Sequence, residues 1–369
     1  MKYFEYGDRE IGFFDMTITI SSMIIGVGVI TLPRDLAKTV ESSDGWISLL
    51  FAGLIAAGCA WTLAYIATHF SKQGYYRYAT AAVTKPIAIF ALLSLALYFI
   101  LFTAFEIRAI ANISKQYLFE NTPVEVISLT FLIVVIYAVT GSRVGLIRLN
   151  ILFIPIVIFI TILVLLFSLG IADSKDLKPF FITDLKSLTV GMKNSTFSFL
   201  GFEVILFYIS LMNRPQHAPK AAVIGVFLPV ILYTAIYLVC VGVFSQMALQ
   251  EITYPAVELA KEMQIPGEFF ERFESIFFTI WIMAVFTTTF MAYDCAVYAL
   301  YSVFPKRKHV TWIFILSPII YLTCMFPKNL TDFSKYSMYI SYIGVVVSIL
   351  FPIIIHVIAK VRGVKSDVV

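Results

Sequence analysis

Two closely spaced glycines in an apolar segment are the first residues that suggest a ligand site. The segment Ile25–Pro33 contains Gly26 and Gly28, and glycine costs a helix about 1 kcal/mol per position relative to alanine. A helix that unwinds here exposes backbone N–H groups, and the half-helix that follows points its positive dipole end at the gap. A ligand carboxylate fits such a gap, with Gly26, Val27 and Gly28 as contacts. The alternative is close helix packing through small residues.

A second interruption lies in another apolar segment, where Phe199, Leu200 and Gly201 are followed by Glu203. Unwound carbonyl groups at the first three positions would accept hydrogen bonds from an ammonium group, with Glu203 nearby as a counter-charge. A carboxylate within an apolar span is costly and usually serves a function. The structural alternative is a hydrogen bond from a protonated Glu203 to a neighbouring helix. Together the two interruptions favour a small-molecule binding site.

Three residues of a further apolar segment repeat at the spacing of one helix face. Tyr98, Phe102 and Glu106 occupy positions i, i+4 and i+8, so a helix places them on the same side. This side would line a pocket beside the two interruptions, and a buried Tyr98 hydroxyl needs a hydrogen-bond partner. Aromatic stripes also arise from packing alone. We predict ligand contacts for Tyr98 and Phe102 and leave the role of Glu106 open.

Two aspartates in apolar segments have an ambiguous role. Tyr293 and Asp294 are adjacent in a later segment, where Tyr293 is a candidate ligand contact. Asp294 either lines an inner vestibule or bonds a neighbouring helix, and the sequence does not choose between these interpretations. Asp15, near the start of the first apolar segment, has the same ambiguity.

No motif in the sequence supports catalysis or a bound metal. The four cysteines have neither metal-ligand nor disulfide spacing and are predicted to be packing residues: Cys59, Cys240, Cys295 and Cys324. A glycine-rich phosphate loop and a Ser/His/Asp arrangement are also absent. The net charge of +4 is spread over short loops, which argues against a nucleic-acid partner. We predict a protein that is not an enzyme and has no cofactor.

The composition indicates that these residues lie in a membrane. Hydrophobic residues make up 60% of the chain and charged residues 14%, with a mean hydropathy of +0.90, whereas a soluble domain has about 25% charged residues. A membrane-spanning helix needs roughly 20 apolar residues. The sequence predicts an all-α integral membrane protein with about ten such helices, at approximately 11–34, 45–70, 83–114, 123–141, 146–170, 189–212, 220–248, 268–302, 309–326 and 337–360.

Ten spans divide into two sets of five. A repeat with an odd number of spans reverses its orientation, so the halves, about 11–170 and 189–360, would be inverted copies within a single permease-like domain over 1–369. Transporter folds of this kind break the first helix of each repeat at the substrate site. The interruptions at 26–28 and 199–201 fall in the first and sixth spans, where this five-plus-five architecture requires them.

The distribution of Lys and Arg predicts the orientation. The segments on the same side as both termini contain more of these residues than the loops on the opposite side. Because positive charge favours the cytoplasmic side, we predict a multi-pass membrane protein with both termini cytoplasmic.

The chain also resembles the B-subunit family of spore germinant receptors, a branch of the amino acid–polyamine–organocation permease superfamily. The resemblance extends over about residues 11–360. It is carried by Ile25–Pro33, Leu118–Pro123, Gly141–Arg143 with Arg148, Tyr254–Ala260 and, most specifically, Phe270–Ile282. The glycine interruption is shared with many permeases, whereas the last segment is much more typical of this family.

The resemblance implies a nutrient sensor in the inner membrane of the dormant spore. Such B subunits act with an A subunit, which has large soluble domains, and with a C-subunit lipoprotein, and they sense small germinants, most often amino acids. The family's expected ligand contacts are the two interruptions, at 26–28 and 199–201. Tyr98, Phe102, Glu203 and Tyr293 are less firmly implied, because the side chains that select the ligand vary within such families.

Two other functions remain compatible with the sequence. A secondary transporter that moves amino acids with H⁺ or Na⁺ would use Glu203 or Asp294 as the coupling acid. A structural scaffold without a ligand of its own would not need the glycine interruptions.

Overall fold

The computed structural model describes residues 10–262 and 273–364, so part of the Phe270–Ile282 segment lies outside the described residues. These residues form helices and loops, with no β-pairing beyond an isolated bridge between Ile11 and Met212. The elements, in chain order, are α1 (Phe13–Ile24), α2 (Gly28–Val40), α3 (Gly45–Thr68), α4 (Gly74–Ala82), α5 (Lys85–Tyr117), α6 (Val124–Val139), α7 (Arg143–Ser168), α8 (Leu185–Asn194), η1 (Phe197–Phe199), η2 (Phe202–Val204), α9 (Ile205–Tyr208), η3 (Ile209–Leu211), η4 (Pro215–His217), α10 (Ala218–Leu249), α11 (Pro255–Glu262), α12 (Phe273–Val303), α13 (His309–Cys324), α14 (Leu330–Gly344), η5 (Val345–Leu350) and α15 (Phe351–Val361).

The helices account for the predicted membrane spans. Six are individually long and apolar enough to cross a membrane, and they contain α3, α5, α7, α10, α12 and the α14–α15 rod. The pair α1 and α2 forms a seventh span, and three shorter apolar helices, at Val124–Val139, Phe202–Leu211 and His309–Cys324, take the places of the fourth, sixth and ninth. The described residues therefore agree with the all-α fold of about ten spans.

The first span is broken where the glycines predict it. Helix α1 ends at Ile24 and α2 begins at Gly28, with a bend of 53° between them. Because Gly26 and Gly28 have no β-carbon, neighbouring groups approach the backbone closely on both sides of the bend. We call this gap the first break.

The sixth span is also interrupted, but over a longer stretch than predicted. Helix α8 starts at Leu185, whereas the span was predicted to start at about 189. The helix ends at Asn194, before the predicted interruption at 199–201. The chain then runs through short 3-10 turns to α9, and Gly201 adopts a φ of +134°, a conformation that side-chain-bearing residues rarely adopt. We call residues 195–204 the second break.

The polar link before α8 is fixed to the start of α3. The Asp44 carboxylate accepts hydrogen bonds from the backbone N–H groups of Phe181, Ile182 and Thr183. Although burial opposes its ionisation, these donors hold the pKa of Asp44 below its ordinary value. The Ser48 hydroxyl donates to the Leu188 carbonyl of α8 at 2.9 Å. These contacts hold α8 in place and so fix the chain that leads into the second break.

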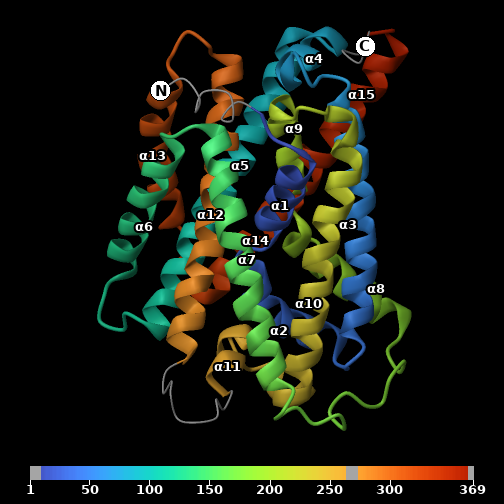
Figure 1. The fold of residues 1–369 in the computed structure, drawn as a ribbon, viewed down its shortest axis with the longest axis vertical. Coiled ribbons are helices and arrows are strands. Elements are labelled where there is room, and N and C mark those ends of the chain that lie inside the picture. The colour runs from blue at the N-terminus through green and yellow to red at the C-terminus, as the bar shows by residue number, and fades with distance from the viewer. Residues whose placement is uncertain (1–9, 263–272, 365–369) are drawn as a thin grey trace.

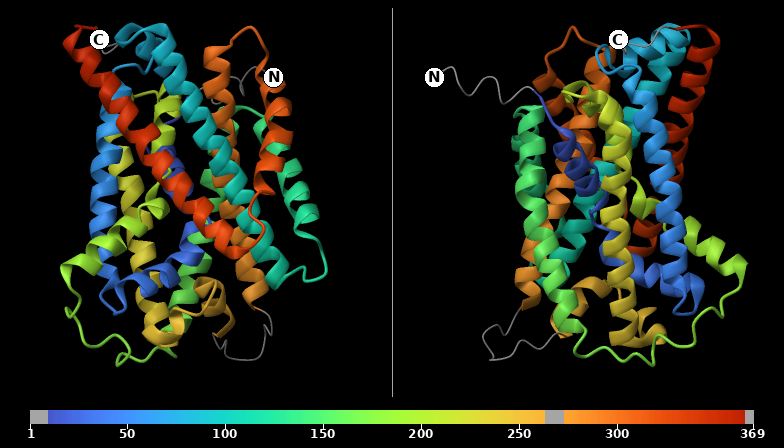
Figure 2. Two further views of the ribbon diagram at one scale, coloured as in Figure 1. Left: turned by 180° about the vertical axis from the view of Figure 1, so that it is seen from behind. Right: turned by 45° about the vertical axis from the view of Figure 1, so that its right-hand side comes forward.

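Helix α1 lies among longer helices, whereas α8 lies at the outer edge of the molecule (Figure 1). Helix α1 packs against α10, α7 and α12, while α5 packs along α12. The rod α14–η5–α15 crosses the back of the molecule at a tilt (Figure 2). The end of α15 lies near α4, whereas α8 and α11 lie at the opposite end (Figure 1). This arrangement places both breaks between helices from the two halves of the chain.

Candidate ligand site at the two helix breaks

The two breaks touch each other. A β-carbon on Gly201 would lie 2.9 Å from the backbone carbonyl carbon and oxygen of Met23, at the end of α1. A β-carbon on Gly28 would lie 3.2 Å from the Ser198 hydroxyl oxygen and 3.3 Å from its α-carbon. Glycine is therefore required at Gly201 both by its φ and by this backbone contact, and the predicted interruptions form one continuous region.

Glu203, within the second break, accepts two short hydrogen bonds. Its side chain is 0% exposed. It accepts a hydrogen bond from the Tyr98 hydroxyl at 2.6 Å and one from the Gly201 backbone N–H at 2.7 Å. The structure thus brings together Tyr98, Gly201 and Glu203 from distant parts of the chain. Both hydrogen-bond donors are uncharged, so the Glu203 carboxyl group has no cationic partner among these contacts.

Glu106, whose role the sequence left open, lies at the first break. It is 2% exposed, and its Oε2 accepts a long hydrogen bond of 3.4 Å from the backbone N–H of Val27. A β-carbon on Gly26 would lie 3.1 Å and 3.2 Å from its two carboxyl oxygens. The helical spacing that places Tyr98 and Glu106 on one face of α5 therefore brings one residue to each break. The amide group expected to receive a ligand carboxylate already faces a protein carboxyl group.

Hydroxyl groups from two further helices donate hydrogen bonds to carbonyls in the last turn of α1. The Tyr233 hydroxyl of α10 donates to the Ile24 carbonyl at 2.6 Å. The Thr288 hydroxyl of α12 donates to the Ser22 carbonyl at 3.1 Å. Neither residue was predicted from the sequence. Their only sequence signal is a hydroxyl-bearing side chain within an apolar helix, and the chain contains many of these.

Apolar side chains fill the rest of this region. The ring of Phe199 packs on Tyr233, with 5.5 Å between ring centroids, and Phe102 packs on Tyr98 at 6.0 Å. A β-carbon on Gly344 would lie 2.7 Å from the Tyr98 ring and 2.9 Å from Leu200. The predicted contacts Phe102, Phe199 and Leu200 are buried. They would offer an apolar wall to a ligand.

Tyr293 is not brought to the breaks by its hydrogen bonds. Its hydroxyl donates to the Ile313 carbonyl at 2.5 Å and lies 2.9 Å from the Ser317 hydroxyl, both on α13. This hydroxyl therefore joins α12 to α13. Its assignment as a ligand contact stays a prediction without a direct polar contact to either break.

Asp294 belongs to a separate buried cluster of charged and aromatic groups. Its Oδ2 is 2.8 Å from Arg143 Nε and accepts a hydrogen bond of 2.6 Å from the Tyr208 hydroxyl. The Arg143 guanidinium also donates to the Phe207 carbonyl at 3.2 Å and stacks over the rings of Tyr208 and Tyr298. Of the two roles left open for Asp294, the structure supports bonding to neighbouring helices. The cluster ties α9 to α7 and α12.

Asp15 has a structural role at the start of the first span. Its carboxylate accepts a hydrogen bond from the Gly12 backbone N–H at 2.8 Å, which caps α1. It also lies 3.9 Å from the Arg148 guanidinium, whose side chain is half exposed. The structure places Asp15 at this helix terminus and not in the region of the breaks.

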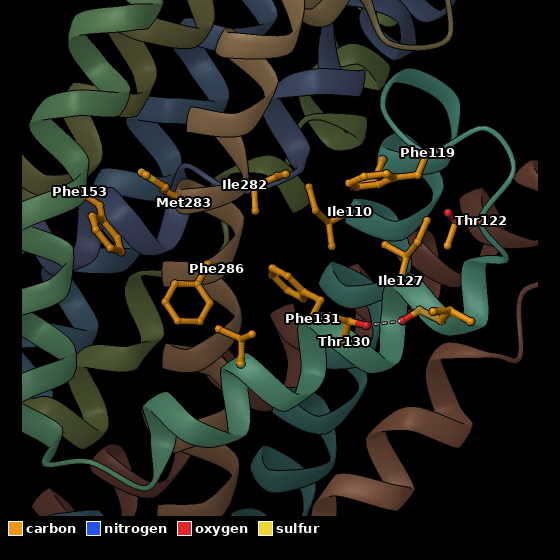
Figure 3. Close-up of a pocket in the computed structure, with 13 residues that line it drawn as sticks. Ile110, Phe119, Thr122, Ile127, Thr130, Phe131, Phe153, Ile282, Met283 and Phe286 are labelled. Atoms are coloured by element: carbon orange, nitrogen blue, oxygen red, sulfur yellow. Dashed lines mark hydrogen bonds between the residues drawn. The ribbon is translucent and has the colours of Figure 1, made fainter.

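A separate cavity of about 520 Å³ lies between α5, α6, α7 and α12 (Figure 3). It is almost entirely apolar, and its walls come from α5, α6, α7, α12 and the loop before α6. Side chains such as Ile110, Phe131 and Phe286 point into it (Figure 3). None of the predicted ligand contacts lines it, and it offers no charged group to a polar nutrient. We therefore locate the candidate site at the breaks.

A metal site has no support in the described part of the chain. Among residues 10–262 and 273–364, no group of three or more His, Cys, Asp or Glu side chains could hold an ion. The cysteines are free thiols within or beside the apolar core. The chemistry of the region rests on Glu106, Glu203 and backbone groups.

The arrangement of helices is similar to that of a solved transporter. The structure of MHP1, a nucleobase-cation-symport-1 family transporter, in a closed conformation with bromovinylhydantoin bound, matches with a TM-score of 0.64. The match covers 98% of this chain and 96% of that chain at 11% identity. A likeness at this identity concerns the fold, and it confirms the predicted inverted-repeat permease architecture.

Sequence comparison supplies the family. The model described as "Spore germination protein" matches residues 10–333. The chain is 43% identical to the spore germination protein GerLB of Bacillus cereus, over 98% of this chain and 97% of that protein. It is 31% identical to the spore germination protein YndE of Bacillus subtilis (strain 168), over 94% and 95%. This multi-pass membrane protein belongs to the spore germination protein family, which confirms the resemblance to germinant receptor B subunits.

Proposed function

We propose that this chain senses a nutrient, an amino acid, for a spore germinant receptor and binds it between the two breaks. The observation that carries the proposal is the direct contact of the breaks, with the buried Glu203 carboxyl group between Tyr98 and Gly201. Backbone groups freed from helical pairing need new partners; at the breaks the protein's own side chains supply some of them, and a small polar ligand would replace or add to these partners. The ligand contacts would be Gly26, Val27, Gly28, Tyr98, Phe102, Phe199, Leu200, Gly201 and Glu203, with Tyr293 contributing from α12.

A ligand at the second break would act on a segment tied to the Asp294 cluster. Glu203 lies at the start of the short segment η2–α9, and Tyr208 lies at the end of α9 with its hydroxyl on Asp294. A displacement of Glu203 would therefore be transmitted along the five residues 204–208 to Tyr208, which contacts the cluster on α7 and α12. A sensor needs only a ligand-dependent bias between two such states.

The partners and location follow from the resemblance. We propose that an A subunit and a C-subunit lipoprotein read the change in the spore inner membrane, and that both termini are cytoplasmic. The described chain begins and ends at the same end of the molecule (Figure 1), in accord with an even number of spans. We also propose that 1–369 form one permease-like domain with repeats at about 11–170 and 189–360.

The decisive experiment separates a sensor from an amino acid transporter. Because a sensor requires binding without a transport cycle, the purified chain in liposomes should bind its amino acid but not accumulate it under an imposed H⁺ or Na⁺ gradient. In spores, deletion of either partner gene should abolish the nutrient response. Gradient-driven uptake by the isolated chain, together with a response that does not depend on the partners, would establish the transporter instead.

Replacement of Glu203 tests the polar contact at the second break. Glu203→Gln keeps the side-chain size but loses the charge, and a charge-assisted hydrogen bond contributes about 1.5–3 kcal/mol. We expect the half-maximal nutrient concentration to rise roughly tenfold to over a hundredfold, at normal protein levels. Glu258→Gln is the matched control, because Glu258 accepts a similar hydrogen bond of 2.7 Å from Tyr117 outside the site. An unchanged dose response in Glu203→Gln would remove this residue from the site.

A further inference from the structure

The charge of the breaks indicates which part of the ligand the protein recognises. Both breaks hold a buried carboxyl group, Glu106 at the first and Glu203 at the second. We infer that the site binds its ligand through a positively charged ammonium group and does not require a ligand carboxylate. The inference rests on the proposed function, because it concerns the same site, and it assigns Glu106 a role in selecting the charge of the ligand.

Glu106 occupies the position where a ligand carboxylate was expected. The positive end of the α2 dipole and its free N–H groups form a natural anion site. In the structure Glu106 faces this end, with Oε2 3.4 Å from the Val27 nitrogen and both oxygens close to Gly26. A ligand carboxylate at the same place would meet a second carboxyl group within van der Waals distance. The protein thus supplies its own acidic group at the first break.

Three described cations of the membrane-spanning region contact groups other than the two buried glutamates. Arg143 pairs with Asp294, Arg108 donates to the sulfur of Met325, and Lys193 lies over the ring of Tyr342. Among residues 10–262 and 273–364, no ion pair reaches Glu106 or Glu203.

The hydrogen bonds that these two carboxyl groups accept come from Tyr98 and from backbone N–H groups. In its charged form, a buried carboxyl group is stabilised by an ionic partner. Because the described protein supplies none at the breaks, the ligand is the natural source of the positive charge.

The apolar side chains at the breaks indicate what is attached to the ligand's ammonium group. Phe102, Phe199 and Leu200 are apolar and buried, so we expect the group attached to the ammonium to be apolar. The chemical class is therefore a primary amine with an apolar substituent. Aliphatic amino acids belong to this class, and so do their amides, which lack the carboxylate.

A series of analogues tests the inference on the unaltered full-length chain. Binding of alanine, valine and leucine to the purified protein in nanodiscs would be measured by calorimetry, alongside their amides and their N-acetyl derivatives. We expect each amide to bind at least as tightly as its amino acid. Each N-acetyl compound should bind roughly a hundredfold more weakly, because it has lost the ammonium charge.

Glu106→Gln adds a readout that a merely structural role would not change. A carboxamide at this position can donate a hydrogen bond to a ligand carboxylate. The ratio of the affinity for the amino acid to that for its amide should therefore rise about tenfold. Glu258→Gln, the control outside the site, should leave this ratio unchanged. A constant ratio in Glu106→Gln would show that Glu106 does not select the charge of the ligand.

The outcomes separate this inference from the proposed function. Binding of the amino acids without binding of their amides would overturn the inference and leave an amino acid sensor in place. Binding of the N-acetyl compounds alone, or of no compound in the series, would overturn both. Binding of amino acids and amides, with rejection of the N-acetyl compounds, would support both.

Discussion

Gly201→Ala is expected to abolish the nutrient response of spores that carry this chain. Alanine at a φ of +134° costs about 1–3 kcal/mol in backbone strain. Its β-carbon would also lie 2.9 Å from the backbone of Met23, where no side-chain rotation relieves the contact. The two breaks must then move apart, which separates the groups that form the site. Germination would be followed over a wide range of nutrient concentrations, with protein levels checked by immunoblotting.

A matched glycine controls for the loss of flexibility alone. A β-carbon on Gly58, within α3, would meet no atom within 4 Å, so Gly58→Ala should leave the response and the protein level unchanged. A normal response in Gly201→Ala, at the usual concentrations, would show that contact between the breaks is not needed for sensing. That result would favour the scaffold alternative, in which the breaks are dispensable.

Arg143→Gln is expected to cause the largest loss of stability of any single change considered. Asp294 is 0% exposed, and its carboxylate pairs with Arg143 at 2.8 Å. Removal of Arg143 leaves the buried Asp294 carboxylate with the Tyr208 hydroxyl and, 3.7 Å away, the His309 ring, and breaking a buried ion pair typically costs about 3–5 kcal/mol. The melting temperature of the detergent-solubilised protein should fall markedly. A change at this cluster should also weaken the nutrient response, because the cluster holds the end of α9.

A double variant distinguishes loss of the charge balance from loss of the arginine side chain. Arg143→Gln with Asp294→Asn removes both charges and should recover much of the lost melting temperature. The pair Lys261–Glu258, 3.4 Å apart and with an exposed lysine, provides the contrast, because surface pairs contribute about 0–1 kcal/mol. Lys261→Gln should therefore have little effect. If Arg143→Gln were as stable as Lys261→Gln, the buried pair would not hold these helices together.

The sequence alone determined the class of the protein and the positions of the breaks. Charged residues are scarce and the apolar segments are long, so the surrounding solvent must be lipid. About ten helical spans then follow from composition and length. Glycine acts locally, because the absence of a β-carbon is a property of the residue itself. For this reason Gly26, Gly28 and Gly201 located both breaks without a structure, although the end of α8 and the length of the second break were misplaced.

Helical periodicity also determined part of the site. Tyr98 and Glu106 share a face of α5 in the structure as the spacing required. Periodicity shows which residues share a face but not which helix that face meets. The contact of Tyr98 with Glu203, 105 residues away, and of Glu106 with the first break therefore became visible only in the folded chain.

Only the tertiary structure decided the roles of the remaining acidic and tyrosine residues. Asp294 pairs with Arg143, 151 residues away, and Tyr293, its neighbour in sequence, bonds to α13 instead. Adjacent helix positions point about 100° apart, so neighbours in the chain serve different interfaces. An ion pair of this kind depends on where three helices meet, and no local pattern of residues specifies that meeting point.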